Sequence, residues 1–175
     1  MEKESDRRFS AIRSELDRIL AEDGPFEEVA PRILQALCQG LGWDVGIMWK
    51  ADESAEVLRF VASWHDPSGP LTELERVSAR STFSPGVGLP GRILSGREPC
   101  WIRDVQNDIG FPRAQVAMED DLQSGFGFPL LQGRRLVGVT ELFSRETRSS
   151  DRELLASMAP IGVEVGRLLE GEREI

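Results

Sequence analysis

The sequence has few of the residues that most often act in catalysis or bind metals. It holds one histidine, His65, and two cysteines, Cys38 and Cys100, which stand far apart without metal-type spacing. A Ser–His triad or a multi-histidine metal site therefore has at most one candidate histidine. We expect two free thiols in a reducing compartment rather than one disulfide. We interpret His65, which precedes Asp66-Pro67, as a solvated turn residue.

Long apolar runs and clusters of basic residues are also missing. No stretch approaches the ~20 apolar residues that span a bilayer, and the charged start MEKESDRRFS lacks the apolar core of a secretory signal. The formal charge of −9 repels polyphosphate backbones. We therefore expect a cytoplasmic protein without membrane insertion or nucleic-acid binding.

The two ends of the chain predict helices with narrow apolar stripes. Residues 5–22 and 150–172 each place apolar side chains three and four apart, and Ser150 to Glu153 reads as a capping box. Such stripes favour a homodimer, and the alternative is that both pack on the domain's own sheet. The predicted interface residues are Phe9, Ile12, Leu16, Ile19, Leu154, Met158, Ile161, Val165 and Leu168.

Between these ends the pattern predicts a second helix and two hairpins. A helix from Phe26 to Leu41 is followed by alternating strands over 43–50 and 57–64, and a second hairpin covers 125–131 and 136–144. The loop-rich insert 84–121 carries a short strand over 99–105 and short helices after Pro90 and Pro112. This order predicts an α+β fold with an antiparallel sheet rather than a βαβ repeat.

One motif imitates a nucleotide-binding fingerprint. Gly86, Gly88 and Gly91 have G-x-G-x-x-G spacing, but no buried parallel strand precedes them. We expect Pro90 to be the first residue of a short helix, with the glycines permitting the turns before it.

Several segments together resemble bacterial GAF domains. The resemblance runs from about Phe26 to Leu169, and its motifs occur in the expected order. They are Trp43–Gly46, Gly86–Arg92, Trp101–Val105, Phe111–Ala114, Phe126–Pro129 and Gly138–Phe143.

The resemblance implies a GAF/PAS-like central antiparallel sheet of five to six strands with helices on both faces. It implies an N-terminal dimer or linker helix over 1–24, a GAF domain over 25–170, and a C-terminal signalling helix over 150–172. The first and last helices would share one face, and the insert would roof a pocket on the other. The family usually has no chemistry of its own and is linked to kinase, cyclase or regulator output domains.

We expect an unknown small molecule as ligand, planar or anionic, held by Trp101, Phe111, Arg113, Phe126 and Phe128. Aromatic walls with one guanidinium suit such a ligand. The alternative reading makes Phe126 and Phe128 simply core residues. The cysteine settings of the bilin-binding relatives are missing, so the sequence supports no bilin, and a role of His65 as a haem ligand is likewise unsupported.

No metal is expected either. The carboxylates of the insert, Asp104, Asp108, Asp120 and Asp121, match no calcium loop, and Asp104 is better explained as a turn residue.

Three functional hypotheses follow. The first is a non-catalytic, small-molecule-sensing regulatory domain of a bacterial signal-transduction protein, such as a sensor histidine kinase or cyclic-dinucleotide enzyme, acting as a dimeric ligand-controlled switch. The second is a protein-interaction or dimerisation module without a ligand. The third is an enzyme resembling free methionine sulfoxide reductase. It is disfavoured because that branch of the family clusters several cysteines at its pocket.

Overall fold

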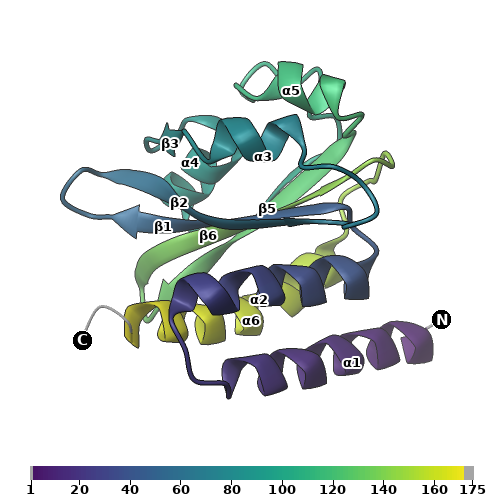
Figure 1. Cartoon of the computed structure of the whole chain (residues 1–175), viewed down its shortest axis with the longest axis vertical. Coiled ribbons are helices and arrows are strands. Elements are labelled where there is room, and N and C mark those ends of the chain that lie inside the picture. The colour runs from purple at the N-terminus through teal and green to yellow at the C-terminus, as the bar shows by residue number, and fades with distance from the viewer. Residues whose placement is uncertain (1, 172–175) are drawn as a thin grey trace.

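The computed structural model describes residues 2–171 and shows one antiparallel sheet with helices on both faces (Figure 1). Its six strands lie in the order β3-β2-β1-β6-β5-β4, so the α+β prediction is confirmed. The strands are β1 (Val45–Asp52), β2 (Val57–His65), β3 (Thr82–Phe83), β4 (Cys100–Ile102), β5 (Ser124–Gln132) and β6 (Arg135–Ser144). The helices are α1 (Glu2–Leu20), α2 (Phe26–Leu41), α3 (Glu73–Ser78), α4 (Gly88–Gly96), α5 (Ala114–Glu119) and α6 (Arg152–Gly171).

One side of the sheet, here called the helical face, is covered by α2 and α6, and α1 lies outside them against α2 (Figure 1). Apolar residues of all three helices join Met48, Phe126 and Leu142 of the sheet in one buried cluster. The first and last helices therefore share a face, as expected. The predicted boundary at residue 24 falls in the turn after α1, although α1 belongs to the same core as the helices that follow.

Helix α6 lies unusually close to β5. A Cβ added at Gly162 would meet the Pro129 carbonyl oxygen at 2.4 Å, and one at Gly166 would meet that of Leu131 at 2.7 Å. Side chains at these two positions would hold the helix away from the strand. The two glycines therefore let helix backbone rest on strand backbone.

The other side of the sheet, here called the insert face, is covered by α3, α4 and α5 (Figure 1). The alternation of side chains along β1 sends Val45, Ile47 and Trp49 to this face and Met48 to the helical face. Buried residues of the insert, including Leu89 and Phe111, complete a second apolar cluster there. Both faces of β1 are therefore buried, as its central place in the sheet requires.

The predicted capping box at the start of the last helix is wrong. Helix α6 begins at Arg152, and the carboxylate of Asp151 accepts a hydrogen bond from the Leu154 amide at 3.0 Å. Aspartate caps a helix as well as serine does, and Asp151 rather than Ser150 is the capping residue here. A capping box does occur at α3, where Thr72 and Glu75 bond each other's backbone amides.

The start of the helix in the glycine-spaced loop also differs from the prediction. Helix α4 begins at Gly88, so Pro90 is its third residue rather than its first. Proline fits there because the amide that it lacks would have no partner within the first turn.

The predicted dimer stripes are largely covered within the single chain. Ile12, Leu16 and Ile19 of α1 are at most 4% exposed because α2 and α6 cover them. Leu154, Met158, Ile161 and Val165 of α6 are likewise buried in that cluster. Only Phe9 and Leu168 of the predicted set keep partly exposed surface. The buried residues of both stripes therefore pack within the domain, as the alternative interpretation expected.

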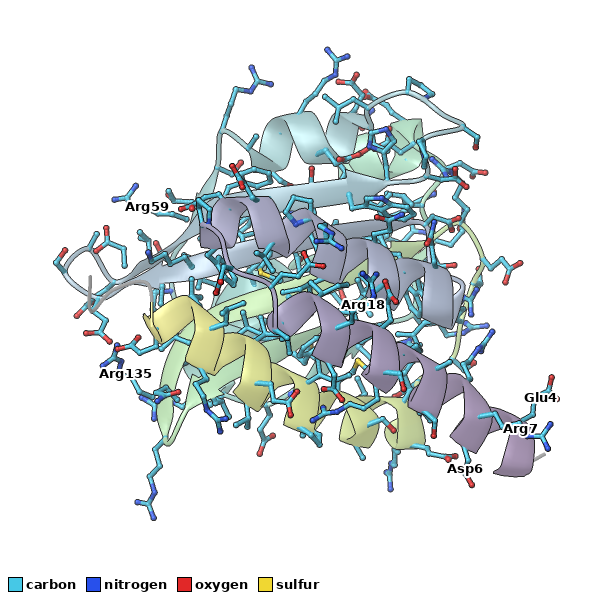
Figure 2. The ribbon with its side chains drawn as sticks, turned by 60° about the horizontal axis from the view of Figure 1, so that its bottom comes forward. Glu4, Asp6, Arg7, Arg18, Arg59 and Arg135 are labelled. Carbon is cyan, nitrogen blue, oxygen red and sulfur yellow. The ribbon has the colours of Figure 1, made fainter. Side chains whose placement is uncertain are left out.

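The outer surface of α1 is polar. Figure 2 labels Glu4, Asp6, Arg7 and Arg18 along this helix, and all four are exposed. Within residues 2–171, no helix combines the length and apolar composition needed to cross a bilayer.

Candidate functional site

The most unusual feature of the insert face is a buried arginine. Arg113 directly precedes α5, and its side chain is only 2% exposed. Its Nη1 donates to Glu141 Oε1 at 3.0 Å and its Nη2 donates to Glu141 Oε2 at 2.6 Å. Glu141, in the middle of β6, is fully buried. The two side chains form a bidentate ion pair that joins the insert to the central sheet.

Two further side chains complete the hydrogen bonding of this pair. Trp49 Nε1 donates to Glu141 Oε1 at 2.7 Å, and Arg113 Nη1 donates to the Ser78 hydroxyl at 3.1 Å. We call Arg113, Glu141, Trp49, Ser78 and the rings around them the Arg113 cluster. Four aromatic rings lie within 6 Å of the guanidinium carbon: Phe83 at 4.8 Å, Phe111 at 4.9 Å, Phe143 at 5.6 Å and Trp49 at 5.8 Å.

One nitrogen atom of the guanidinium makes no hydrogen bond. Arg113 Nε is buried and has no hydrogen-bond acceptor among the described residues. A buried donor without an acceptor costs free energy, of order 1–3 kcal/mol. An acceptor oxygen on the Nε side would therefore satisfy this donor.

The insert helices above the cluster are tied to each other. The Asp120 carboxylate, at the end of α5, accepts hydrogen bonds from the amides of Glu73 and Leu74 at 2.9 and 2.8 Å. These amides begin α3, the helix that supplies Ser78 to Arg113. Movement of α5 would thus be transmitted to α3.

His65 is not the solvated turn residue that the sequence suggested. It ends β2, its side chain is 25% exposed, and its Nδ1 lies 3.0 Å from Glu75 Oε1. Glu75 is buried in α3 and also accepts from Ser63 Oγ at 2.6 Å. Thr72 Oγ1 donates to the same carboxylate at 2.9 Å, so the buried Glu75 side chain is surrounded by several donors.

The five predicted ligand residues do not meet in one place. Phe111 and Arg113 lie in the Arg113 cluster on the insert face. Trp101, Phe126 and Phe128 point to the helical face, where Trp101 stacks on Phe126 with ring centroids 5.2 Å apart. Their strands alternate, so these three rings belong to the core beneath α1, α2 and α6. The structure thus supports the core reading for Phe126 and Phe128.

Glu141, Trp49 and Ser78 complete the cluster and were missed from the sequence. A signal for Glu141 was present, because it is the only charged residue between Leu136 and Phe143, a strand of otherwise apolar or small residues. A carboxylate at the centre of a buried strand needs a cationic partner. No comparable pattern marked Trp49 or Ser78.

The two cysteines lie on opposite faces of the sheet. Cys38 packs in the helical-face core, and Cys100 packs against the insert-face core. Both thiols are free, and burial raises the pKa of each. Their separation by the sheet prevents direct exchange between them.

The described residues contain no group of three or more His, Cys, Asp or Glu side chains placed to hold a metal ion. Asp104, as expected, holds a turn: its carboxylate accepts from the amide and the side chain of Asn107.

Comparison with known families decides the identity of the fold. The model of the GAF domain family matches residues 24–163, which is most of the chain. The chain belongs to the GAF domain family. Members of this family generally act as regulatory sensor modules.

Solved GAF structures share the architecture at low sequence identity. The GAF domain of a phosphoenolpyruvate-protein phosphotransferase from Coxiella burnetii has a TM-score of 0.79 and 16% identity, covering 95% of each chain. The GAF domain of A. aeolicus nlh2 in an inactive state has a TM-score of 0.74 and 20% identity, covering 94% of this chain and 97% of that one. These likenesses establish the fold alone.

Two further similarities come from proteins with different descriptions. Free methionine-R-sulfoxide reductase from Neisseria meningitidis, solved with its substrate, has a TM-score of 0.72 and 16% identity, covering 95% of this chain and 92% of its own. The anthocyanin regulatory Lc protein of Zea mays is 32% identical over 95 residues, which are 49% of this chain and 16% of the maize protein. This GAF domain thus matches only a small part of that relative's length.

Proposed function

We propose that this GAF domain is a non-catalytic regulatory sensor that binds a small planar organic anion at the Arg113 cluster. The observation that carries the proposal is the buried guanidinium, which is surrounded by four rings, has one counter-charge and keeps Nε–H without an acceptor. Aromatic walls with a single arginine suit a flat, negatively charged ligand.

The ion pair supports a role beyond stability. A buried ion pair contributes little net stability, because desolvation of the two charges offsets their attraction. A ligand carboxylate entering beside Arg113 could share or replace Glu141 as the partner of the guanidinium. Arg113 also directly precedes α5, so a ligand there would shift α5 and, through Asp120, the start of α3.

The proposed output is a change in the helices on the other face. Glu141 belongs to β6, which pairs with β5, and β5 carries α6. In a signal-transduction protein this helix would lead to a linked kinase, cyclase or regulator. Coupling between sites of ~1–3 kcal/mol would bias such a partner several-fold. This mechanism operates within one chain, because most of the predicted interface side chains are buried there.

A thermal-shift series tests the proposal. Planar aromatic carboxylates such as benzoate and indole-3-carboxylate are compared with benzyl alcohol and indole-3-methanol, their neutral counterparts. At 100 times its Kd a ligand stabilises by about 2.7 kcal/mol, which would raise Tm by several degrees for a domain of this size. We expect the acids, and not the alcohols, to do so.

Arg148 offers a matched control. Its guanidinium lies 5.1 Å from the Trp43 ring on the helical face and is not part of the cluster. The variant Arg148→Gln should keep the response to the acids, whereas Arg113→Gln should lose it. Equal responses in the two variants would contradict the assignment of Arg113.

A second candidate is a protein-interaction module without a ligand. It is favoured by the packing itself, because the chain's own side chains fill the space where the insert meets the sheet at Arg113. For this candidate, no acid in the series changes Tm.

The reductase alternative is not proposed, because the two cysteines are separated by the sheet. The expected result is that the wild-type protein does not consume free methionine sulfoxide in the presence of dithiothreitol. Turnover that disappears when Cys38 and Cys100 are replaced by serine would reverse this conclusion.

A further inference from the structure

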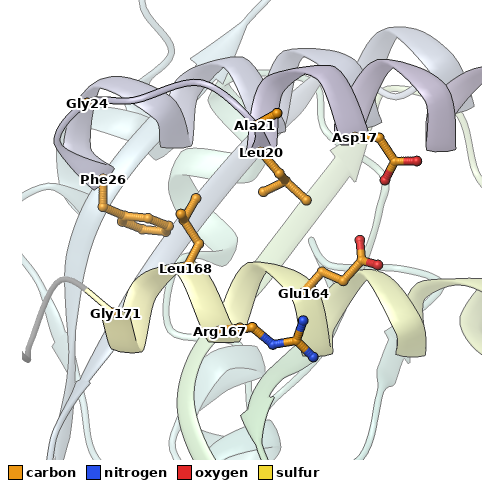
Figure 3. A pocket seen from close by; sticks show the side chains of 9 residues that line it. All are labelled: Asp17, Leu20, Ala21, Gly24, Phe26, Glu164, Arg167, Leu168 and Gly171. Carbon is orange, nitrogen blue, oxygen red and sulfur yellow. The ribbon is translucent and has the colours of Figure 1, made fainter.

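A cavity lies on the helical side of the molecule, between the two terminal helices. Its volume is about 570 Å³, within the range of pockets that hold small organic molecules. Figure 3 shows Leu20 of α1 and Leu168 of α6 pointing into the gap between the helices, with the Phe26 ring at one end. We call this cavity the α1–α6 groove.

The walls of the groove combine apolar surface with few charges. The apolar atoms come from three helices and one turn, through Leu20, Ala21, Phe26 and Leu168. Leu20 and Leu168 are only half-buried, and Ala21 is exposed. Apolar surface that the fold leaves partly in water is available to a ligand of matching length.

The acidic residues of the groove are already paired, whereas its arginine is not. Arg13 lies 3.5 Å from the Asp17 carboxylate and also forms an ion pair with Glu164 across the two helices. Arg167, by contrast, has no ion pair or hydrogen bond among residues 2–171. Arg167 is therefore the charged side chain of the groove that has no partner of its own among the described residues.

We propose that the α1–α6 groove binds a small amphipathic carboxylic acid, such as a medium-chain fatty acid. The hydrocarbon chain would lie on Leu20, Phe26 and Leu168, and the carboxylate would bond to the guanidinium of Arg167. A guanidinium accepts a carboxylate through two parallel hydrogen bonds. This site lies on the helical face and is independent of the Arg113 cluster, so it goes beyond the proposed sensor function.

Such a ligand would fasten α1 to α6. The described contacts between these helices are few apart from the Arg13–Glu164 pair, and α1 packs mainly on α2. A molecule lying between Leu20 and Leu168 would add apolar contact at the other end of the gap. Binding should therefore slow opening of α1 as well as stabilise the domain.

Titration calorimetry with octanoate, and with 1-octanol as a neutral chain of the same length, tests the proposal. We expect octanoate to bind with one site per chain and more tightly than 1-octanol. The variant Arg167→Gln should weaken octanoate several-fold, as expected for an ion pair with an exposed guanidinium, and leave 1-octanol unchanged. The matched control is Arg152→Gln, since Arg152 is also exposed and unpaired on α6.

A second variant tests the apolar part of the α1–α6 groove without disturbing the core. Ala21 is exposed at the end of α1, so Ala21→Glu should fold normally while placing a carboxylate in the groove. Octanoate binding should be lost in this variant.

Three results would overturn the proposal. The first is octanoate binding that is unaffected by both Arg167→Gln and Ala21→Glu. The second is binding that disappears in an Arg113→Gln protein whose circular dichroism shows it to be folded, which would move the ligand to the insert face. The third is binding that weakens as protein concentration rises, with a dimer in native mass spectra, because a second copy would then be the occupant. Failure of the sensor proposal affects none of these measurements, since the aromatic acids are tested against Arg113.

Discussion

Removal of either member of the Arg113–Glu141 pair should destabilise the domain far more than removal of both. Glu141→Gln leaves a guanidinium buried without a counter-charge, and arginine cannot lose its proton in a protein. Arg113→Met leaves a buried carboxylate in the same position. Breaking a buried pair from one side costs about 3–5 kcal/mol, so each single variant should lose about that amount at pH 7.

The double variant Arg113→Met/Glu141→Gln should recover most of this loss. The amide oxygen of glutamine can still accept from Trp49 Nε1, which now donates to Glu141 at 2.7 Å. Methionine is unbranched and flexible, so it can lie among Phe83, Phe111 and the other rings that surround the guanidinium. Some of the cation–π attraction, worth up to about 2 kcal/mol when desolvated, is lost. The coupling energy between the two sites should nevertheless reach about 3 kcal/mol.

Urea unfolding followed by tryptophan fluorescence measures all four proteins of this cycle, and Trp49 reports on the cluster directly. The reasoning is refuted if a single variant loses less than 1 kcal/mol, or if the double variant loses the sum of the two.

Three smaller predictions concern other parts of the chain. Gly166→Ala should cost about 1–3 kcal/mol in urea unfolding, because its Cβ would lie 2.7 Å from a β5 carbonyl oxygen, while Gly96→Ala in α4, where nothing lies within 4 Å, should stabilise slightly. The Asp52 carboxylate accepts from Arg59, which lowers its pKa from 3.8 to about 2. The stability it contributes is therefore complete above pH 3.8 and is lost as pH falls toward 2, and an NMR titration of the carboxyl should have its midpoint near 2. Under native conditions iodoacetamide should modify half-buried Cys100 slowly and Cys38 only on unfolding, and equal rates by mass spectrometry would contradict this.

Periodicity predicted the elements of this fold well, because each long helix and each paired strand buries a regular set of side chains. The terminal helices and the two hairpins appeared where apolar spacing placed them. The two-residue strand β3 did not, since Thr82 and Phe83 are too few to show a period. The spacing of apolar residues could not predict which element covers the apolar face of each helix. The apolar pattern of α1 is the same whether α2 or a second chain covers it.

Two of the five predicted ligand residues lie in the Arg113 cluster. Phe111 and Arg113 were chosen because an aromatic and a guanidinium stood together in the insert, and the structure places both in the Arg113 cluster. Trp101 was assigned to the wrong face, because in a three-residue strand nothing local distinguishes its direction from that of Ile102. Glu141 lies 28 positions after Arg113, and their pairing depends on where the sheet brings β6 under α5.

The two glycines of α6 also set the mechanics of the domain. Side chains between a helix and a sheet can change rotamer and absorb a small displacement, but a main-chain carbonyl meeting a bare Cα has no such freedom. Helix α6 and strand β5 should therefore travel as a single stiff unit. A shift of the sheet by a fraction of an ångström would reach the carboxyl end of α6 almost undamped, and a domain linked to this helix would be displaced with it.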